Sequence, residues 1–187
     1  MTFAPIAPVP FWYLRHGETD WNAQGLSQGS IDIPLNATGL AQAQSAAQQL
    51  RNRGIKTIVS SPLSRARVTA EIVAEALGLP VLFDSALKEV NWGVQEGQPA
   101  SDWFAEWTDH GFAPEGAETF AQLRHRATAG VNRSLALPAD VLIVAHGAVF
   151  RVLRAAMGLD AHIRTRNAVP MRCTPTTDGW TIDPLGI

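Results

Sequence analysis

Short apolar runs alternate with amphipathic segments along this chain of 187 residues, and that alternation constrains its fold more than any other feature. The apolar runs have the length of buried strands and lie at residues 11–14, 56–60, 81–83, 140–145, 168–174 and 180–182. The segments between them carry apolar residues at helical spacing, at residues 38–50, 61–77, 118–135 and 148–157. We therefore predict an α/β fold, a three-layer α/β/α sandwich with a mostly parallel central sheet.

Residues at the ends of two helices suggest where those helices begin. Thr38 has a side chain typical of an N-cap and precedes the first helical stripe. Ser61 followed by Pro62 has the pattern of a cap and a first-turn proline. We expect the first two long helices to start at these positions.

The composition is that of one soluble globular domain spanning residues 1–187. The formal net charge of −2 disfavours nucleic acid as a partner. Cys173 is the only cysteine, so an internal disulfide is excluded and a cytoplasmic location is expected. No apolar run is long enough to span a membrane, and the start of the chain lacks the features of a signal peptide. No CxxC or HExxH motif is present, so we expect neither a metal nor another cofactor.

Residues 84–117 are less regular than the rest of the chain and contain Trp92, Trp103 and Trp107. We interpret this segment as an insertion over one edge of the sheet that serves as a lid, with a short helix near residues 101–110. The three tryptophans either line the substrate pocket or pack the insertion, and packing is the favoured interpretation.

Polar residues follow three of the predicted strands, at the point where each strand ends. Arg15 and His16 follow the first strand, Arg65 lies in the first turn of the helix after the second, and His146 follows the strand DVLIVA. In an open α/β sheet, ligands bind at the carboxyl ends of the strands. Two arginines and two histidines that meet there form a site suited to a dianionic phosphate.

Four segments of the sequence resemble the signature blocks of the histidine phosphatase superfamily, which includes the cofactor-dependent phosphoglycerate mutases. They are YLRHGETDWN, SSPLSRARVTA, LKEVNWG and VAHG, and they occur in the family's order. The loop SQGSIDIPLNATG is also similar to the family's segment after the first block. The resemblance implies a phosphoglycerate mutase-like fold and phosphoryl transfer through a phosphohistidine.

The resemblance also implies a role for each matching residue. His16 is the expected nucleophile, because a neutral imidazole attacks phosphorus near pH 7 without a metal. Arg15 and Arg65 are expected to hold the phosphoryl oxygens, and His146 to donate a hydrogen bond to them. Glu89 is the expected general acid, and later the base that activates water. The remaining expected substrate-binding residues are Asn22 and Gln28.

Other polar residues receive structural interpretations. We expect Glu18 to tie the first loop by hydrogen bonds and Arg67 to lie in solvent. Cys173 is expected to fill a small core position. The histidines outside the blocks are expected at the surface; they are His110, His125 and His162.

The chain is short, and its PEGAET segment departs from the PGGES block of the mutases, so phosphatase is favoured over mutase. A mutase must exclude water from its phosphoenzyme, which a longer insertion helps to do. The predicted function is a metal-independent phosphatase acting on a small phosphate monoester. A mutase-type phosphotransferase and a non-catalytic phosphate-binding protein remain as alternatives. The sequence leaves open the ester and the oligomeric state.

Overall fold

The computed structural model describes residues 4–99 and 103–186. Its centre is a six-stranded sheet in the order β3-β2-β4-β1-β5-β6. The strands are β1 (Phe11–Arg15), β2 (Thr57–Ser60), β3 (Val81–Phe83), β4 (Val141–Ala145), β5 (Met171–Thr176) and β6 (Gly179–Pro184). The first four pair in parallel, whereas β5 and β6 add an antiparallel edge beside β1. The prediction of a mostly parallel central sheet is confirmed.

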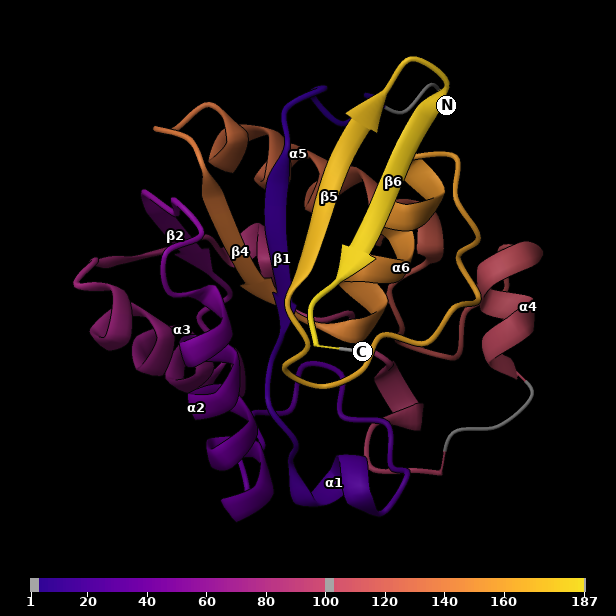
Figure 1. The fold of residues 1–187 in the computed structure, drawn as a ribbon. Coiled ribbons are helices and arrows are strands. Elements are labelled where there is room, and N and C mark those ends of the chain that lie inside the picture. Colours follow the sequence, from indigo (N-terminus) through magenta and orange to yellow (C-terminus); the bar gives the residue numbers. More distant parts are fainter. Residues whose placement is uncertain (1–3, 100–102, 187) are drawn as a thin grey trace.

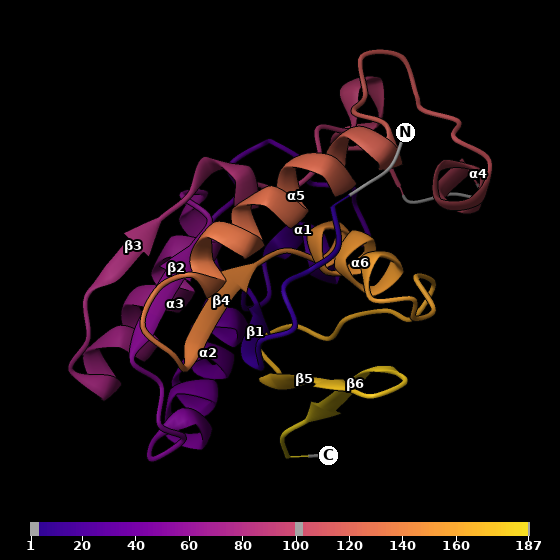
Figure 2. The ribbon, with the colours of Figure 1, turned by 90° about the horizontal axis from the view of Figure 1, so that it is seen from above.

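Helices cover both faces of this sheet (Figures 1 and 2). One face is covered by α2 (Ala37–Leu50) and α3 (Ser64–Leu77), and the other by α5 (Phe120–Leu135) and α6 (Gly147–Ala156). Two separate apolar cores result, because alternate strand residues point to opposite faces. In β1, for example, Phe11 and Tyr13 join one core, whereas Trp12 and Leu14 join the other.

Two predicted helix starts were wrong. Asn36, not Thr38, is the N-cap of α2, and its Oδ1 accepts a hydrogen bond of 2.8 Å from the Gly39 amide. Helix α3 begins at Ser64 rather than at Ser61-Pro62.

A distant carboxylate explains the later start of α3. Asp32 Oδ1 accepts hydrogen bonds from the amide of Ser64 at 2.7 Å and from its hydroxyl at 2.8 Å. Asp32, from a distant segment, therefore accepts the hydrogen bond at the helix start that the local sequence pattern assigned to Ser61. The hydroxyl of Ser61 accepts from the Leu63 amide at 3.3 Å, just before the helix, and also pairs with His146 at 2.7 Å.

The predicted insertion, residues 84–117, contains short elements and loops. Within its described part lie the 3₁₀ turns η1 (Ser85–Leu87) and η2 (Gly93–Gln95) and the helix α4 (Trp103–Asp109). The predicted helix near 101–110 is present from residue 103, and its first two predicted residues fall outside the described part. Figure 2 shows α4 lying beyond α6, away from the sheet. The strand predicted at residues 168–174 is β5, which starts at Met171 rather than at Ala168, where the backbone has a positive φ of 48°.

Among residues 4–99 and 103–186, we find no helix both long and apolar enough to cross a membrane. Cys173 is fully buried in the core, as expected.

Candidate active site

Parallel pairing of β1 with β4 places the two predicted histidines side by side. Arg15 is paired with Ala145 in the sheet, and the His16 amide donates to the Ala145 carbonyl at 3.0 Å. His16 and His146 therefore leave neighbouring strands at the same edge, with ring centroids 5.2 Å apart. Loop residues 16–36 and the short helix α1 (Asp20–Ala23) lie beyond this edge, at the bottom of Figure 1.

The loop after His16 is held by a close approach of two backbones. A Cβ on Gly17 would lie 2.3 Å from the carbonyl oxygen of Gly39 in α2, so a larger residue would force the segments apart. The Gly17 amide donates to Thr69 Oγ1 at 3.1 Å, and Glu18 Oε1 accepts from Asn36 Nδ2 at 3.1 Å. The side chain of Glu18 thus ties the loop, as predicted.

One hydrogen bond determines the tautomer of His16. Its Nδ1 lies 2.7 Å from the carbonyl oxygen of Gly17, which can only accept, so Nδ1 carries the proton. The lone pair is then on Nε2. Burial lowers the pKa of His16 well below its ordinary range, and the positive charges of Arg15 and Arg65 lower it further. A buried ring with a free Nε2 lone pair at neutral pH is chemically a nucleophile.

The two arginines beside His16 are fixed by backbone carbonyls. Arg15 donates from Nη1 to Thr165 at 2.7 Å, and Arg65 donates to Ile31 at 2.8 Å and to Gly29 at 2.7 Å. Within the described part of the chain, the Nε atoms of both arginines are buried without a hydrogen-bond partner. Buried, unpaired donors of this kind are suited to an anion that enters from outside.

Both guanidinium groups remain cationic although they are buried. Burial lowers the pKa of Arg15 to about 10, and the negative charge of Glu89 opposes that shift. Burial also lowers the pKa of Arg65, again opposed by Glu89. Arg67, two residues further along α3, is about half exposed and pairs with Glu71, as predicted for a solvent residue.

His146 lies behind His16, is fully buried, and is not among the cavity-lining residues. Its Nε2 pairs with Ser61 Oγ at 2.7 Å, and its Nδ1 has no partner among the described residues. Burial lowers the pKa of His146 well below its ordinary range, with further lowering by Arg65 and His16. The ring is therefore neutral, and the hydroxyl of Tyr13 holds its backbone through two hydrogen bonds, of 2.7 and 3.1 Å.

Glu89 reaches the cavity from the insertion and meets the start of α6. Its Oε2 accepts from the Ala148 amide at 3.0 Å, and its Oε1 accepts from the Val149 amide at 3.2 Å. The first amides of a helix lack partners within it and favour an anion. Glu89 thus lines the same cavity as His16 although the two residues come from different layers of the fold.

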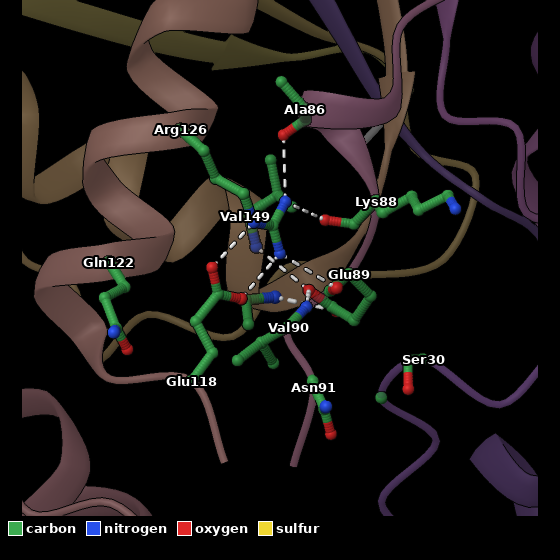
Figure 3. A network of polar contacts seen from close by, with 12 residues as sticks. Ser30, Ala86, Lys88, Glu89, Val90, Asn91, Glu118, Gln122, Arg126 and Val149 are labelled. Carbon is green, nitrogen blue, oxygen red and sulfur yellow. Dashed lines mark hydrogen bonds and ion pairs between the residues drawn. The ribbon is translucent and has the colours of Figure 1, made fainter. Parts of the chain in front are cut away.

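An arginine on α5 holds the backbone around Glu89 (Figure 3). Arg126 donates to the carbonyls of Ala86, Lys88 and Glu89, at 2.9, 2.7 and 3.0 Å. Glu118 binds the same guanidinium through both oxygens, each at 2.7 Å. Sequence analysis missed this contact, because nothing in the local pattern around Arg126 distinguishes it from a surface arginine.

The residues around His16 enclose a cavity of about 360 Å³. Its lining includes six predicted site residues and several that the sequence did not point to. The predicted ones besides Arg15 and His16 are Asn22, Gln28, Arg65 and Glu89, and the missed ones include Phe104, Arg151, Arg164 and Thr165. The missed residues belong to no signature block, so only their place in the fold identifies them.

Asn22 and Gln28 differ in how firmly they are held. Asn22 Oδ1 accepts from Asn167 Nδ2 at 3.1 Å and from the Thr19 amide at 3.3 Å, which closes a capping box on α1. Gln28 is buried, and its Oε1 has no partner among the described residues. Asn167, a residue that the sequence did not point to, also donates to the His16 carbonyl at 3.0 Å.

The three tryptophans of the insertion pack mainly against one another and their neighbours. Trp92 is 4.7 Å from Trp107 and 4.9 Å from Trp103, measured between ring centroids, with the rings steeply inclined. Trp107 is fully buried, and its Nε1 donates to the Glu118 carbonyl at 2.9 Å. Only Trp92 of the three also lines the cavity.

The histidines outside the signature blocks lie apart from this cavity. His110 is 3.1 Å from Glu106, His162 is 2.9 Å from Asp109, and His125 is exposed. In residues 4–99 and 103–186 we find no group of three or more His, Cys, Asp or Glu side chains placed to hold a metal ion.

Comparisons with known proteins agree on one family. The model of the histidine phosphatase superfamily (branch 1) matches residues 11–185. A Yersinia enterocolitica protein named "Probable phosphoglycerate mutase GpmB" is 39% identical over 195 residues, covering 92% of this chain and 90% of the relative. Mycobacterial hydrolase 1 has a TM-score of 0.82 at 31% identity, covering 94% of this chain and 96% of its own. Mycobacterial glucosyl-3-phosphoglycerate phosphatase, in complex with VO3, has a TM-score of 0.81 at 31% identity, covering 94% and 97%.

Proposed function

The chain belongs to the histidine phosphatase superfamily (branch 1), and from that membership we propose that it is a metal-independent phosphatase of small phosphate monoesters. The observation that carries this proposal is the hydrogen bond from His16 Nδ1 to the Gly17 carbonyl. It leaves the Nε2 lone pair available on a neutral ring that lines a cavity with two arginines. That arrangement supports attack on phosphorus by His16.

In the first step, His16 Nε2 forms a bond to phosphorus as the bond to the ester oxygen breaks. Arg15 and Arg65 hold the phosphoryl oxygens, and their unpaired Nε–H groups supply donors for them. Glu89 gives its proton to the leaving oxygen, so that the product departs as an alcohol. We assign to His146 a hydrogen bond to the phosphoryl group. It would come from Nδ1, the ring nitrogen that has no partner among the described residues.

In the second step, water attacks the phosphorus of phosphorylated His16, and Glu89 takes up the proton of that water. Phosphate then leaves with His16 neutral again. Water can reach this cavity, because lining residues such as Gly25 and Arg164 are exposed. This access supports hydrolysis rather than return of the phosphoryl group to a product.

A mutase is the second candidate, and the relative named as a phosphoglycerate mutase supports it. A mutase would pass the phosphoryl group from His16 back to a second hydroxyl of the same substrate. The same residues would serve, so the two functions differ only in whether water reaches the phosphoenzyme before the product is rephosphorylated.

The test is phosphate release from 3-phosphoglycerate, glycerol 3-phosphate and p-nitrophenyl phosphate in the presence of EDTA. We expect release with undiminished rate, and a rapid acid-free quench with labelled substrate should trap an acid-labile, base-stable phosphoenzyme. His16→Ala should trap none, whereas His125→Ala, which changes an exposed histidine outside the cavity, should trap as much as the wild type.

Loss of activity on chelation, restored by a divalent metal, would contradict the proposed mechanism. Conversion of 3-phosphoglycerate into 2-phosphoglycerate faster than phosphate release would favour the mutase. Binding of phosphate without turnover of any ester would favour the non-catalytic alternative.

A further inference from the structure

His146 can assist the proposed reaction only if a ring nitrogen offers a proton to the phosphoryl group. Nε2 is already paired with Ser61 Oγ at 2.7 Å, and Nδ1 is buried without a partner among the described residues. A neutral imidazole has one N–H donor and one acceptor nitrogen. Nδ1 therefore serves as the donor only when the proton of the ring is on Nδ1 rather than on Nε2.

The ring has to donate without carrying a positive charge. Burial lowers the pKa of His146 well below its ordinary range, and the positive charge of Arg65 lowers it further. In a protonated ring both nitrogens would donate, and no tautomer would have to be selected. In a neutral ring, the partner of one nitrogen decides which nitrogen carries the proton. The partner of Nε2, the hydroxyl of Ser61, is therefore in the position to select the tautomer of His146.

The sheet places Ser61 beside His146. Ser61 directly follows β2, and its amide donates to the carbonyl of Val144 in β4 at 3.0 Å, which continues the parallel pairing of the two strands. Ser61 is also fully buried. Its side chain therefore leaves β2 next to the point where His146 leaves β4, and the contact between them depends on strand pairing rather than on a loop.

The hydrogen bonds of the Ser61 hydroxyl determine where its own proton goes. Oγ accepts from the Leu63 amide at 3.3 Å, and its only other polar partner among the described residues is His146 Nε2. A buried hydroxyl proton without an acceptor costs free energy. With the ring proton on Nε2, Oγ would accept from two N–H groups and its own proton would have no acceptor. With Nε2 unprotonated, Oγ donates to it, and Nδ1–H is the one group of this set left to pair.

The backbone that carries the ring is fixed as well. Tyr13 Oη donates to the His146 carbonyl at 2.7 Å and accepts from the His146 amide at 3.1 Å. The ring of Tyr13 stacks on that of Phe150 in α6, with centroids 4.1 Å apart. Tyr13 thus holds the main chain of His146 and Ser61 holds one edge of its ring, so that Nδ1 has a defined position.

We propose that Ser61 is a positioning residue that donates its hydroxyl proton to His146 Nε2 and thereby keeps the proton of the neutral ring on Nδ1, where it is offered to the phosphoryl group. This inference rests on the proposed function for the acceptor, but the tautomer is a property of the resting protein. The two histidines then share one tautomer and use it in opposite ways. The Gly17 carbonyl binds Nδ1–H of His16 and leaves its lone pair free, whereas Ser61 binds the lone pair of His146 and leaves its N–H free.

Nitrogen NMR of the wild-type protein measures the tautomer directly. In protein with ¹⁵N-labelled histidine at pH 7, protonated and unprotonated ring nitrogens differ widely in chemical shift, and couplings to the carbon-bound ring protons distinguish Nδ1 from Nε2. The signals that disappear in His146→Gln are those of His146. We expect its proton on Nδ1, as in His16, and we expect inorganic phosphate to shift the Nδ1 signal without changing the tautomer. A proton on Nε2, or on both nitrogens, would overturn the proposal.

Ser61→Ala removes the hydroxyl and should leave the tautomer of His146 unselected. We expect the fraction of Nδ1–H on His146 to fall, while His16, whose partner is a carbonyl, keeps its tautomer. On p-nitrophenyl phosphate, kcat should fall by about 10-fold or more and KM should change less, because a donor to the transition state is lost. Ser61→Thr keeps a hydroxyl and should retain the tautomer and most of kcat. Ser134→Ala is the matched control, since Ser134 is a buried serine of α5 whose hydroxyl donates to the Gly130 carbonyl.

A double variant distinguishes positioning of His146 from a general structural defect. Because Ser61 acts through His146, Ser61→Ala in a His146→Gln background should lower kcat further by no more than about twofold. A purely structural role of Ser61 would give the same loss in both backgrounds. That outcome, or a His146 tautomer that Ser61→Ala leaves unchanged, would overturn the proposal.

The NMR measurement needs no turnover, so it separates this proposal from the proposed function. If no ester is hydrolysed but His146 carries its proton on Nδ1 and loses that preference in Ser61→Ala, the phosphatase function fails and the role of Ser61 stands. If esters are hydrolysed while the proton of His146 is on Nε2, the phosphatase function stands and the role of Ser61 fails.

Discussion

Two walls of the cavity are held by different kinds of contact. One carries Arg15, His16 and Arg65, and the other carries Glu89, Trp92 and Phe104. We refer to them as the phosphate wall and the insertion wall. The phosphate wall is attached to the ends of hydrogen-bonded parallel strands, and backbone carbonyls hold both of its arginines. Its geometry therefore follows from the sheet itself.

Side-chain contacts hold the insertion wall instead. Arg126 binds three carbonyls of the segment that ends at Glu89, and Glu118 holds Arg126 from the other side. Its main-chain connection to the end of the insertion is an isolated bridge between Trp92 and Ala117, flanked by hydrogen bonds from the Val94 amide to the Glu115 carbonyl at 3.1 Å and from the Glu118 amide to the Asn91 carbonyl at 2.8 Å. Strand pairing and backbone carbonyls thus position Arg15, His16 and Arg65, whereas Glu89 is positioned by the side chain of Arg126 and by two amides at the start of α6.

The difference suggests how each wall should respond to substitution. A change in the phosphate wall removes a group from a rigid frame and should abolish a whole step. A change behind the insertion wall should shift Glu89 by a small distance and affect only the step that needs its proton.

Among the predictions, replacement of Arg65, a single charge on the phosphate wall, should lower kcat the most. Arg65→Ala should lower kcat by about 10²- to 10³-fold, because a preorganised donor to the phosphoryl group is lost. Arg67→Ala, on the exposed side of the same helix, should change kcat by less than about twofold. Steady-state rates on p-nitrophenyl phosphate measure both.

Thermal unfolding distinguishes lost chemistry from lost fold at this buried position. Arg65→Lys keeps a charge and should retain a folded transition while still losing most of the activity. Similar rates for the Arg65 and Arg67 variants would contradict the placement of Arg65 in the phosphate wall.

Glu89→Gln should sharpen the comparison, because its effect should depend on the leaving group. On glycerol 3-phosphate, whose alkoxide needs a proton, kcat should fall by about 10²-fold or more. On p-nitrophenyl phosphate the loss in the first step should be far smaller, since nitrophenolate leaves unaided. If Glu89 also activates water, phosphoenzyme should accumulate with the activated ester. Equal loss on both esters without a trapped phosphoenzyme would remove Glu89 from proton transfer, and Glu96, Glu106, Glu115 and Glu118 would be tested next.

Arg126→Leu should show the same leaving-group dependence at a smaller magnitude. We expect about a 10-fold loss on glycerol 3-phosphate and little loss on p-nitrophenyl phosphate, because Glu89 remains but is held less well. His125→Leu is the matched control on α5, since His125 is exposed and is not among the residues that line the cavity. Equal losses on the two esters would indicate a general defect in folding rather than misplacement of Glu89.

The smallest expected effect is a dependence of stability on pH that arises from the two buried histidines, His16 and His146. Burial lowers the pKa values of His16 and His146, so the unfolded chain binds protons that the folded chain does not as pH falls below about 6.5. Above that pH the two states do not differ at these groups. Below it, each histidine should lower the free energy of unfolding by at most about 1.4 kcal/mol per pH unit.

Chemical denaturation at pH 7 and at pH 5.5 measures this loss. His16→Gln should reduce it, whereas the exposed His125→Gln should leave it unchanged. A loss of the same size in all three proteins would show that other groups cause it.

The sequence identified the phosphate wall almost completely and the insertion wall only in part. Arg15, His16 and Arg65 lie in motifs next to strands, where local pattern is informative, and the structure brings them together. Glu89 also came from a motif, and it lines the same cavity. Arg126, Phe104, Arg151 and Arg164 were missed, because their roles arise from contacts with segments far away in the chain.

Helix starts show the same division on a smaller scale. Local pattern placed the start of α3 at Ser61, but Asp32 caps it at Ser64 from another segment. A cap that arrives by tertiary contact leaves no signal in the residues next to the helix.

By itself, the sequence determined the α/β alternation, the strand ends that carry histidine and arginine, and the motifs of the family. Only the tertiary structure decided that β4 lies between β2 and β1, which places His146 behind His16 and gathers Arg65 on the same side. Only it decided that Arg151 and Arg164 share a cavity with them. The physical reason is that apolar periodicity is a local property of the chain, whereas strand order and cavity lining depend on which distant surfaces pack together.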